Sequence, residues 1–441
     1  MTNYFRALYY LHSMMKRVFW DHKKLREHQD KRLRKIVKSA YENSYFYHEK
    51  FRQAEIKPED VRNIEDLNKL PIVRKEELLE NLDSVISKEF NIDYLHVERT
   101  SGSTGRPLSV YLTGVETEFR KAKHLRAQMT CGQKPWHKWV TITSPLHFAT
   151  TTRLQRLLGF YVITPVSVFE DVTTQVSRIE TLKPDVLDGY SSSVLLLAEE
   201  THKRGLDTIE PKFLVSGAEL IDTSSREFIE DVFAAPLYDQ YASEEFGRMA
   251  WQCPERNEYH IDADSIAMQF IDQDGEEVAP GEEGEIVCTS LFNYAMPFIR
   301  YAIGDLGVTS ETIACPCGRT FPLMKVIGGR KESIVVLPDG RSLSPLAIGD
   351  CMCAYKYFTH VFQYRFIQEK IDFFKILLKK KDSGVKDEVM KVELVEHFRK
   401  TLKLSEAEAT IEVDFMDEIP PDKTGKIRKV VSELEDNKQC V

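Results

Sequence analysis

Short apolar runs alternate with helical stretches through the middle of the chain, and this alternation constrains the fold more than any other feature. The runs are bounded by Gly or Pro and are rich in β-branched and aromatic residues, as buried strands are. Examples are WVTIT at 139–143, FYVITPV at 160–166, PKFLVSG at 211–217 and GEIVCTS at 284–290. Because strands that alternate with helices form sheets covered by helices, we expect an α/β fold.

Changes of pattern on either side of this region indicate the domain organisation. The first 90 residues are mostly helical in pattern. The end of the chain combines two short strands around Asp339-Gly340, two β-rich runs, a helix and a last strand. We therefore expect a large multi-sheet N-terminal domain and a small α+β C-terminal domain. The expected parts are a helical segment of the large domain (1–90), its main body (91–329), a hinge (330–332) and the small domain (333–441).

Composition narrows the class of protein. The 441 residues are 42% hydrophobic, which is enough for a packed core. The balance of 60 basic against 69 acidic residues gives −9, which disfavours a nucleic-acid partner. Eight cysteines are too few for a disulfide scaffold, so we expect a cytoplasmic protein. No apolar stretch reaches the roughly 18 residues of a membrane-spanning helix, so neither an integral membrane segment nor a signal peptide is expected.

Basic residues are concentrated at the N-terminus. Residues 1–40 contain 11 Lys and Arg against 3 acidic residues, and Leu25, Leu33, Ile36 and Val37 recur near helical spacing. Such a helix could contact anionic lipid or a partner through its basic face. The alternative is a helix that packs on the main domain and exposes its charges to solvent, and we favour this alternative.

A loop rich in hydroxyls and glycines follows the first helical region. Its sequence is Thr-Ser-Gly-Ser-Thr-Gly-Arg-Pro over 100–107. Glycines let such a loop approach phosphate oxygens, and backbone N–H groups and hydroxyls then bind them. It is not the nucleoside-triphosphate loop that ends in Gly-Lys-Ser/Thr, because the Lys is absent. An ordinary flexible Ser/Gly turn is the alternative.

Four further motifs follow in order: LYDQYASEE at 237–245, MPFIRYAIGD at 296–305, GRKE at 329–332 and PPDKTGKIR at 420–428. Together with the loop, this set resembles the acyl-adenylate-forming superfamily over roughly residues 35–430. Within that superfamily the chain is most similar to the phenylacetate–coenzyme A ligase branch. The resemblance implies a large ATP-binding domain, a mobile small domain, and ATP-dependent activation of a carboxylic acid with Mg²⁺.

The resemblance also implies roles for individual residues. The β- and γ-phosphates of ATP would be held by Ser101, Gly102, Ser103, Thr104 and Gly105. The adenine pocket would be lined by Gly217, Ala218 and Glu219, and the ring of Tyr241 would stack on the base. The neighbouring Asp239, Gln240, Ala242 and Ser243 would also bind ATP. The ribose would bind Asp305 and Arg330, Mg²⁺ would bind Thr104 and Glu245, and Glu332 would be the hinge residue.

Each of these residues also has a structural interpretation. Ala242 stands where the family usually has Gly, which is a departure from the expected loop geometry. Buried Tyr or Asp side chains can be satisfied polar groups of the core. Asp305 follows Gly304 and could be a turn residue. Glu244 and Glu245 could be two solvated carboxylates, and the register between them stays open.

Lys426 is the expected catalytic cation. Acyl-adenylate formation brings a carboxylate against the α-phosphate of ATP, and a cation that bridges the two anions stabilises the transition state. A Lys in a glycine-containing loop of a small domain can enter the site and later be withdrawn. A surface Lys is the alternative, and Lys423 is the next candidate.

A metal site is expected from two Cys/His pairs. Cys253 and His260 lie in CPERNEYH, and Cys315 and Cys317 lie in a Cys-Pro-Cys-Gly turn. Three thiolates and an imidazole suit tetrahedral Zn²⁺, and four protein ligands indicate a structural ion. The resemblance to the phenylacetate ligase-like branch supports this site. Four unrelated buried side chains are the alternative, and the Cys351-Met352-Cys353 pair is expected to pack in a core.

The acid substrate is expected at the ends of two strands. His147 in SPLHF and Tyr190 and Ser191 in DGYSSS match segments that line the acid in the family, although His147 could equally be a structural histidine. Aryl or arylacetic acids are the first class to consider, and coenzyme A is the expected acceptor. The alternatives are transfer of the acyl group to an amine and nucleotidyl transfer to an acceptor. A non-enzymatic binding module would leave the ordered motifs unexplained. The chain is expected to be a monomer or a homodimer.

Overall fold

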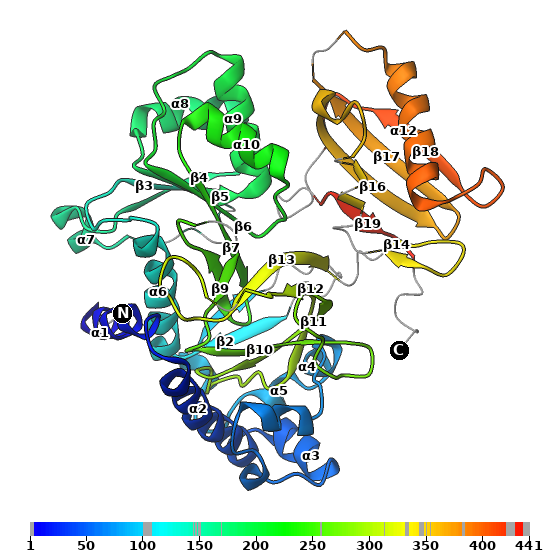
Figure 1. Ribbon diagram of the computed structural model, residues 1–441. Helices are drawn as coiled ribbons and strands as arrows, with labels where there is room; N and C mark the ends of the chain where they lie inside the picture. The colour runs from blue at the N-terminus through cyan, green and yellow to red at the C-terminus, as the bar shows by residue number, and fades with distance from the viewer. Residues whose placement is uncertain are drawn as a thin grey trace. The chain divides into compact units, whose positions relative to one another are not determined.

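The computed structural model describes residues 4–99, 108–143, 145, 148, 151–168, 170–255, 258–312, 314–330, 335–343, 348–349, 351–352, 354–381, 384–419 and 428–434. Contacts divide the chain into two compact units (Figure 1). The first unit comprises Met1–Ala218, Thr223–Ile303 and Gly307–Ile327, and the second comprises Glu219–Asp222, Gly304–Leu306 and Gly328–Val441. Each unit has its own apolar core.

An 11-stranded mixed sheet carries the strands of the large α/β region, which confirms the expected fold class. The apolar runs of the sequence form its strands, and most residues of β3, β6 and β11 are buried, whereas those of β4 are mostly half-buried. Their order is β10-β11-β12-β13-β9-β8-β7-β6-β5-β3-β4. The parallel half consists of β3 (Trp139–Thr143), β4 (Ile163–Ser167), β5 (Val186–Tyr190), β6 (Phe213–Gly217) and β7 (Leu237–Ser243). The other half consists of β8 (Gly247–Gln252), β9 (Tyr259–Ile261), β10 (Ile266–Ile271), β11 (Glu283–Ser290), β12 (Tyr301–Thr309) and β13 (Leu323–Arg330).

Helices connect the parallel strands, as expected for α/β architecture. Asp171 caps α8 and Thr113 caps α6, each through a side-chain oxygen that accepts a backbone N–H. Figure 1 shows α8, α9 and α10 gathered at the parallel half of the sheet. The helices of this region are α6 (Gly114–Thr130), α7 (Arg153–Leu158), α8 (Val172–Leu182), α9 (Ser191–Lys203) and α10 (Thr223–Phe233).

The N-terminal segment is mostly helical and belongs to the first unit. In the basic helix α2, Leu33, Ile36 and Val37 are fully buried in the main core, and its charges lie on the outer side. This is the packed arrangement rather than a separate basic arm. The segment contains α1 (Tyr4–Arg17), α2 (His22–Asn43), α3 (Tyr45–Gln53), α4 (Lys75–Glu80), α5 (Leu82–Val85), the 3₁₀ helices η1 (Pro58–Asp60), η2 (Ile64–Lys69) and η3 (Ile92–Tyr94), and the hairpin of β1 (His96–Arg99) and β2 (Ser109–Leu112).

The second unit contains a four-stranded sheet of order β18-β17-β16-β19. Leu394 and Phe398 of α12 (Asp387–Leu402) are buried in a core with Phe366 and Phe374 of the sheet. Gly340 has φ +86 in the Asp-Gly turn of the predicted hairpin. The strands are β14 (Val335–Val336), β15 (Ser342–Leu343), β16 (Val361–Lys370), β17 (Phe373–Lys380), β18 (Thr410–Phe415) and β19 (Val430–Ser432), with η6 at Phe358–His360.

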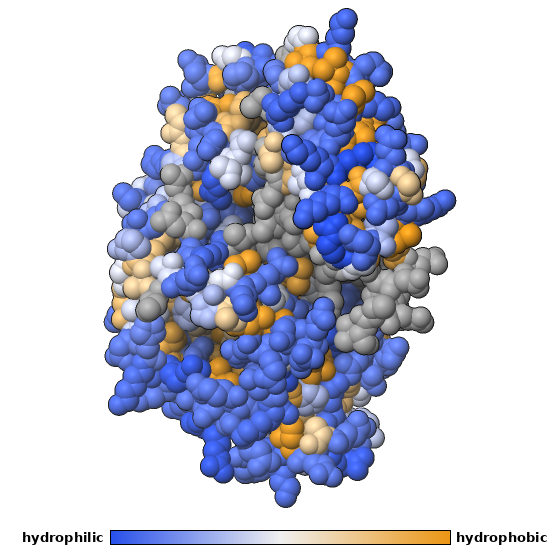
Figure 2. All heavy atoms as spheres, turned by 45° about the vertical axis from the view of Figure 1, so that its right-hand side comes forward, coloured by the Kyte–Doolittle hydropathy of each residue, from blue (hydrophilic) through white to orange (hydrophobic). Residues whose placement is uncertain are grey.

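Side chains on the face drawn in Figure 2 are mostly hydrophilic, and the apolar groups form small separate patches. Among the described residues, no helix is both long enough and apolar enough to cross a bilayer.

Candidate nucleotide and metal sites

Three neighbouring parallel strands bring predicted site residues to one edge of the sheet. Tyr190 at the end of β5 pairs with Gly217 at the end of β6, and Gly217 pairs with Gln240 of β7. Ligands of α/β sheets bind beyond the carboxyl ends of the strands, so this edge is a candidate binding site. A Cβ at Gly217 would lie 3.0 Å from the carbonyl oxygen of Gln240, which explains why glycine occupies this position. Ala218, the next residue, has φ +65.

The side chains of the β7 motif differ in their burial and in their hydrogen-bond partners. The Asp239 carboxylate accepts hydrogen bonds from Ser216 Oγ and, at 2.6 Å, from Tyr259 Oη, and burial raises its pKa. It therefore supports the sheet from within. The buried Gln240 amide nitrogen has no hydrogen-bond partner among the described residues, so it is a donor still to be satisfied. Tyr241 is buried in the main core, and a β-bulge separates it from the exposed Ala242; Ser243 ends the strand.

The structure distinguishes the two adjacent glutamates after β7. Glu245 is buried, whereas Glu244 is half-buried. Tyr301 Oη donates to Glu245 Oε1 at 3.1 Å, and Asn293 Nδ2 donates to the Glu245 carbonyl at 2.9 Å. A carboxylate held in this way is an oriented oxygen ligand of the kind that Mg²⁺ prefers.

Sequence reasoning missed the cations that support this turn. Arg120 and Lys123 of α6 donate to the carbonyls of residues 244–246. Burial lowers the pKa of Lys123 to about 7. The only signal in the sequence was a pair of cations at i and i+3 on a helix, and this spacing is equally common on exposed faces.

Three of the predicted site residues, Glu219, Asp305 and Arg330, belong to the second unit. Asp305 lies half-buried in β12 after Gly304, which has φ +84, and Glu219 is half-buried. Arg330 is the last residue of β13. The other predicted site residues lie outside the described residues: Ser101, Gly102, Ser103, Thr104, Gly105, His147, Glu332 and Lys426.

The predicted acid-binding segment contains a half-buried titratable group, Asp188. Tyr190 is buried, and its Oη accepts from Thr143 Oγ1 at 3.3 Å; Ser191 opens α9 and is also buried. Burial raises the pKa of Asp188, two residues earlier on β5, to about 7. Gln128 Nε2 of α6 lies 3.5 Å from its carboxylate. The Asp188 carboxyl is therefore protonated at acidic pH and loses its proton near neutral pH.

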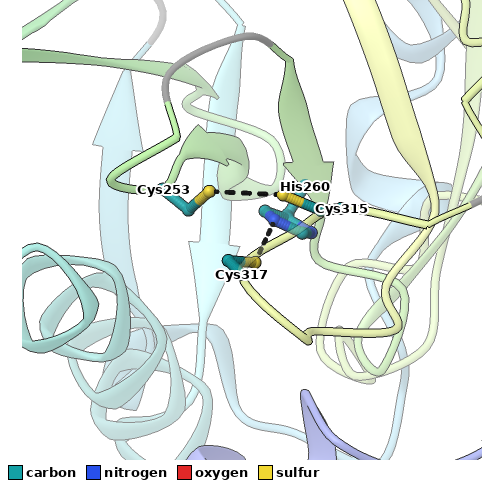
Figure 3. Close-up of side chains that lie close together, drawn as sticks. All are labelled: Cys253, His260, Cys315 and Cys317. Atoms are coloured by element: carbon teal, nitrogen blue, oxygen red, sulfur yellow. Dashed lines mark hydrogen bonds between the residues drawn. The ribbon is translucent and has the colours of Figure 1, made fainter.

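The predicted metal ligands lie together, as Figure 3 shows. One ligand atom from each of Cys253, His260, Cys315 and Cys317 lies within 4.8 Å of the others. The Sγ atoms of Cys253 and Cys315 are 3.6 Å apart, and Cys317 Sγ is 3.3 Å from His260 Nε2. Ligands about 2.3 Å from a tetrahedral Zn²⁺ are separated by roughly 3.8 Å, so the spacing suits this ion.

Local structure explains how the four residues meet. Cys253 directly follows β8 and His260 lies on the paired strand β9, while Cys315 and Cys317 lie in the turn before β13. Gly318 has φ +76 and donates its N–H to the Cys315 carbonyl, which closes the turn. Burial lowers the pKa of His260 to about 4, so the imidazole is neutral, which is the form that binds metals. Cys351 is buried in the core of the second unit, as expected, and Cys353 lies outside the described residues.

No family model matches the chain. The chain is 28% identical over 383 residues to a phenylacetate-coenzyme A ligase of Thermus thermophilus, covering 85% of this chain and 82% of the relative. It is 28% identical over 324 residues to a phenylacetate-coenzyme A ligase of Escherichia coli, covering 70% of this chain and 72% of the relative.

Solved structures show the same fold. A 2-hydroxyisobutyryl-CoA ligase in complex with 2-HIB-AMP in the postadenylation state has a TM-score of 0.79 at 19% identity, covering 96% of this chain and 92% of the other. An anthranilate CoA ligase in complex with anthranoyl-AMP has a TM-score of 0.56 at 14% identity, covering 77% of this chain and 67% of the other.

Proposed function

Since the chain belongs to the acyl-adenylate-forming superfamily, in its phenylacetate–coenzyme A ligase-like branch, we propose that it activates a carboxylic acid with ATP and transfers the acyl group to coenzyme A. The observation that carries this proposal is the edge of the sheet at β5, β6 and β7. Motif residues far apart in sequence are paired there in register, beside a buried and oriented Glu245. The similarity to phenylacetate-coenzyme A ligases over most of the chain supports the same assignment.

The proposed chemistry has two steps. The substrate carboxylate attacks the α-phosphorus of ATP, the bond to the β-phosphate oxygen breaks, and pyrophosphate leaves with acyl-AMP as product. The sulfur of coenzyme A then attacks the acyl carbon, and AMP leaves as the thiol loses its proton. Mg²⁺ would neutralise phosphate charge in the first step, and Glu245 and Thr104 are the proposed ligands.

The other roles follow from the motifs. We assign the phosphates to the loop at 100–107, the adenine to Tyr241 and the segment 217–219, and the ribose to Asp305 and Arg330. Lys426 is the proposed cation at the α-phosphate. Glu332 is the proposed hinge residue, and the small domain from 333 to 441 is the proposed carrier of Lys426.

Aryl or arylacetic acids are the proposed substrate class. The names of the similar phenylacetate-coenzyme A ligases and of the anthranilate CoA ligase support testing this class first. His147, Tyr190 and Ser191 are the residues proposed to line the acid. The 2-hydroxyisobutyryl-CoA ligase is a reason to include short branched hydroxy acids in the same panel.

A structural Zn²⁺ is the proposed occupant of the Cys253, His260, Cys315 and Cys317 site. Three thiol groups, one neutral imidazole and the tetrahedral spacing support this assignment. Four protein ligands leave no open position for substrate, so the ion would stabilise the fold rather than take part in catalysis.

Pyrophosphate release with a panel of acids tests the proposed function. Purified protein, ATP and Mg²⁺ are incubated with each acid, with and without coenzyme A. Pyrophosphate release is measured, and the products are identified by mass spectrometry. We expect acid-dependent pyrophosphate release and an acyl-coenzyme A product. An amide or a nucleotidylated acceptor would identify one of the two alternative reactions. Release of ADP, or pyrophosphate release that no acid stimulates, would contradict acid adenylation.

A further inference from the structure

Three consecutive backbone carbonyls around the proposed magnesium ligand are held by cations of one helix. Arg120 Nη1 donates to the Glu244 carbonyl at 2.7 Å, and Arg120 Nη2 donates to the Glu245 carbonyl. Lys123 Nζ, one turn later on α6, donates to the Phe246 carbonyl at 2.9 Å. The turn that carries Glu245 is therefore attached to α6 at each of its residues.

The same guanidinium also reaches the strand that precedes the predicted phosphate loop. Arg120 Nη1 lies 2.7 Å from Glu98 Oε2, and the side chains of Arg120 and Glu98 are 9% and 39% exposed. Glu98 lies on β1, two residues before Thr100, where the Ser/Gly-rich loop begins. A planar guanidinium has several donors in a fixed geometry, so one side chain can hold both segments at a set separation.

From these contacts we propose that Arg120 is a positioning residue that fixes the magnesium carboxylate by holding the turn of Glu245 to β1. This inference rests on the proposed function, because it takes Glu245 as the Mg²⁺ ligand. Arg120 would not touch the nucleotide. It would hold the turn of Glu245 and Glu98 of β1 in one arrangement, so that the Glu245 carboxylate is oriented for Mg²⁺.

Another arginine of the same helix provides a matched control. The Arg126 side chain is fully buried and that of Arg120 is 9% exposed, but the guanidinium of Arg126 pairs with the carboxylates of Asp262 and Asp264. Within the described part of the chain it binds neither the turn at 244–246 nor β1, so replacing it should disturb packing without changing Mg²⁺ binding selectively.

The test measures nucleotide affinity as a function of free Mg²⁺. The probe is α,β-methylene-ATP, which needs no knowledge of the acid, and the method is isothermal titration calorimetry. Arg120→Lys keeps the positive charge but loses the planar guanidinium with its several donors. We expect the affinity of this variant for the nucleotide analogue in the presence of Mg²⁺ to fall about 10–100-fold, the usual effect of removing a group that orients a metal ligand. Its affinity without Mg²⁺ should stay close to that of the unchanged protein. Arg126→Lys should lower the thermal midpoint and leave the Mg²⁺ dependence unaltered.

The outcomes separate the two proposals. If the unchanged protein binds no nucleotide, the proposed function fails. If it binds nucleotide and Arg120→Lys shows the same Mg²⁺ dependence, only the positioning role is overturned. If Arg120→Lys does not fold, Glu98→Gln is tested in its place. Glu98 is half-exposed, and this substitution removes only the ion pair between Arg120 and β1. Glu98→Gln is expected to shift the Mg²⁺ dependence in the same direction, and an unshifted curve would overturn the positioning role.

Discussion

Among single residues, Asp188 makes the stability of the fold depend on pH in the acidic to neutral range. The ordinary Asp pKa of 3.8 rises to about 7 at this position because the carboxyl is buried. Between these two values the unfolded chain has lost the proton while the folded chain keeps it. Folded-state stability therefore falls as pH rises from about 4 to 7, and it changes little above the folded pKa.

Asp188→Asn should remove this pH dependence. Between pH 5 and about pH 7 the Asp188 carboxyl of the wild-type protein is protonated in the folded state only. Over these two pH units the free energy of unfolding falls by ~1.4 kcal/mol per unit. The stability of the variant relative to wild type should therefore rise by about 2–3 kcal/mol over this interval. Urea unfolding of both proteins at the two pH values measures the difference. The buried histidines titrate in both proteins and cancel, so parallel pH profiles would contradict the raised pKa.

Asp305→Ala tests the proposed ribose contact. Loss of a hydrogen bond that involves a charged group should weaken ATP binding by about 1.5–3 kcal/mol. Pyrophosphate has no ribose, so its affinity should change much less. Calorimetric titration with each ligand gives the comparison, and the exposed Asp274→Ala serves as the charge-matched control. Equal weakening of ATP and pyrophosphate binding would show that Asp305 acts on the fold rather than on the ribose.

At the scale of elements, buried charges join the first helices to the sheet. Arg126 of α6 contacts Asp262 and Asp264 in the turn between β9 and β10, and Arg17 of α1 contacts Asp264 at 3.4 Å. Arg248 of β8 pairs with Asp262 at 2.9 Å, so each of these five charged side chains has a partner of opposite charge. Removing one member would leave an uncompensated charge, which costs more than the pair contributes.

The Cys/His site lies beside this cluster and connects β8, β9 and the turn before β13. We expect as-purified protein to contain about one zinc per chain, as a tetrahedral structural site requires. Cys315→Ser should lower both the zinc content and the thermal midpoint, because the ion crosslinks segments far apart in sequence. Mass spectrometry of the metal and a thermal melt provide the two measurements.

Cys351→Ser is the control for this prediction, because Cys351 is a buried cysteine in the core of the second unit. It should retain the metal. Metal-free protein that melts at the same temperature as the loaded protein would show that the four residues are only packed together.

At the scale of the whole molecule, the two half-reactions can be separated by a variant of the C-terminal segment. Lys426→Ala should slow acyl-AMP formation by about 10²–10³-fold, as expected when one charge contact of a transition state is lost. ATP affinity should change little. Thioester formation from supplied acyl-AMP should stay near the wild-type rate, because that step bypasses attack on the phosphate. Single-turnover kinetics of each step provide the measurement.

Lys423→Ala is the paired control for Lys426→Ala. It should leave both half-reactions near wild type. Equal loss of both steps in folded Lys426→Ala, or loss of adenylation in Lys423→Ala instead, would move the catalytic role to another lysine of the segment.

The fold class, the hairpin at Asp339-Gly340 and the proximity of the four Cys/His residues could be predicted from the sequence. Strand and turn patterns depend on neighbouring residues, so they can be read locally. Cys and His residues in such motifs are typical of metal sites, and the structure places the four predicted ligand atoms together. The ATP and acid roles stay predictions that rest on the motifs.

Which polar side chains are buried and hydrogen-bonded inside the fold could be learned from the tertiary structure but not from the sequence. Asp239 turns its carboxylate to Ser216 and Tyr259, and Glu245 rather than Glu244 is the buried glutamate. Arg120 reaches carbonyls 124 and 125 positions away in the chain. Such contacts depend on which strands and helices become neighbours, and no local pattern distinguishes a buried cation on a helix from an exposed one.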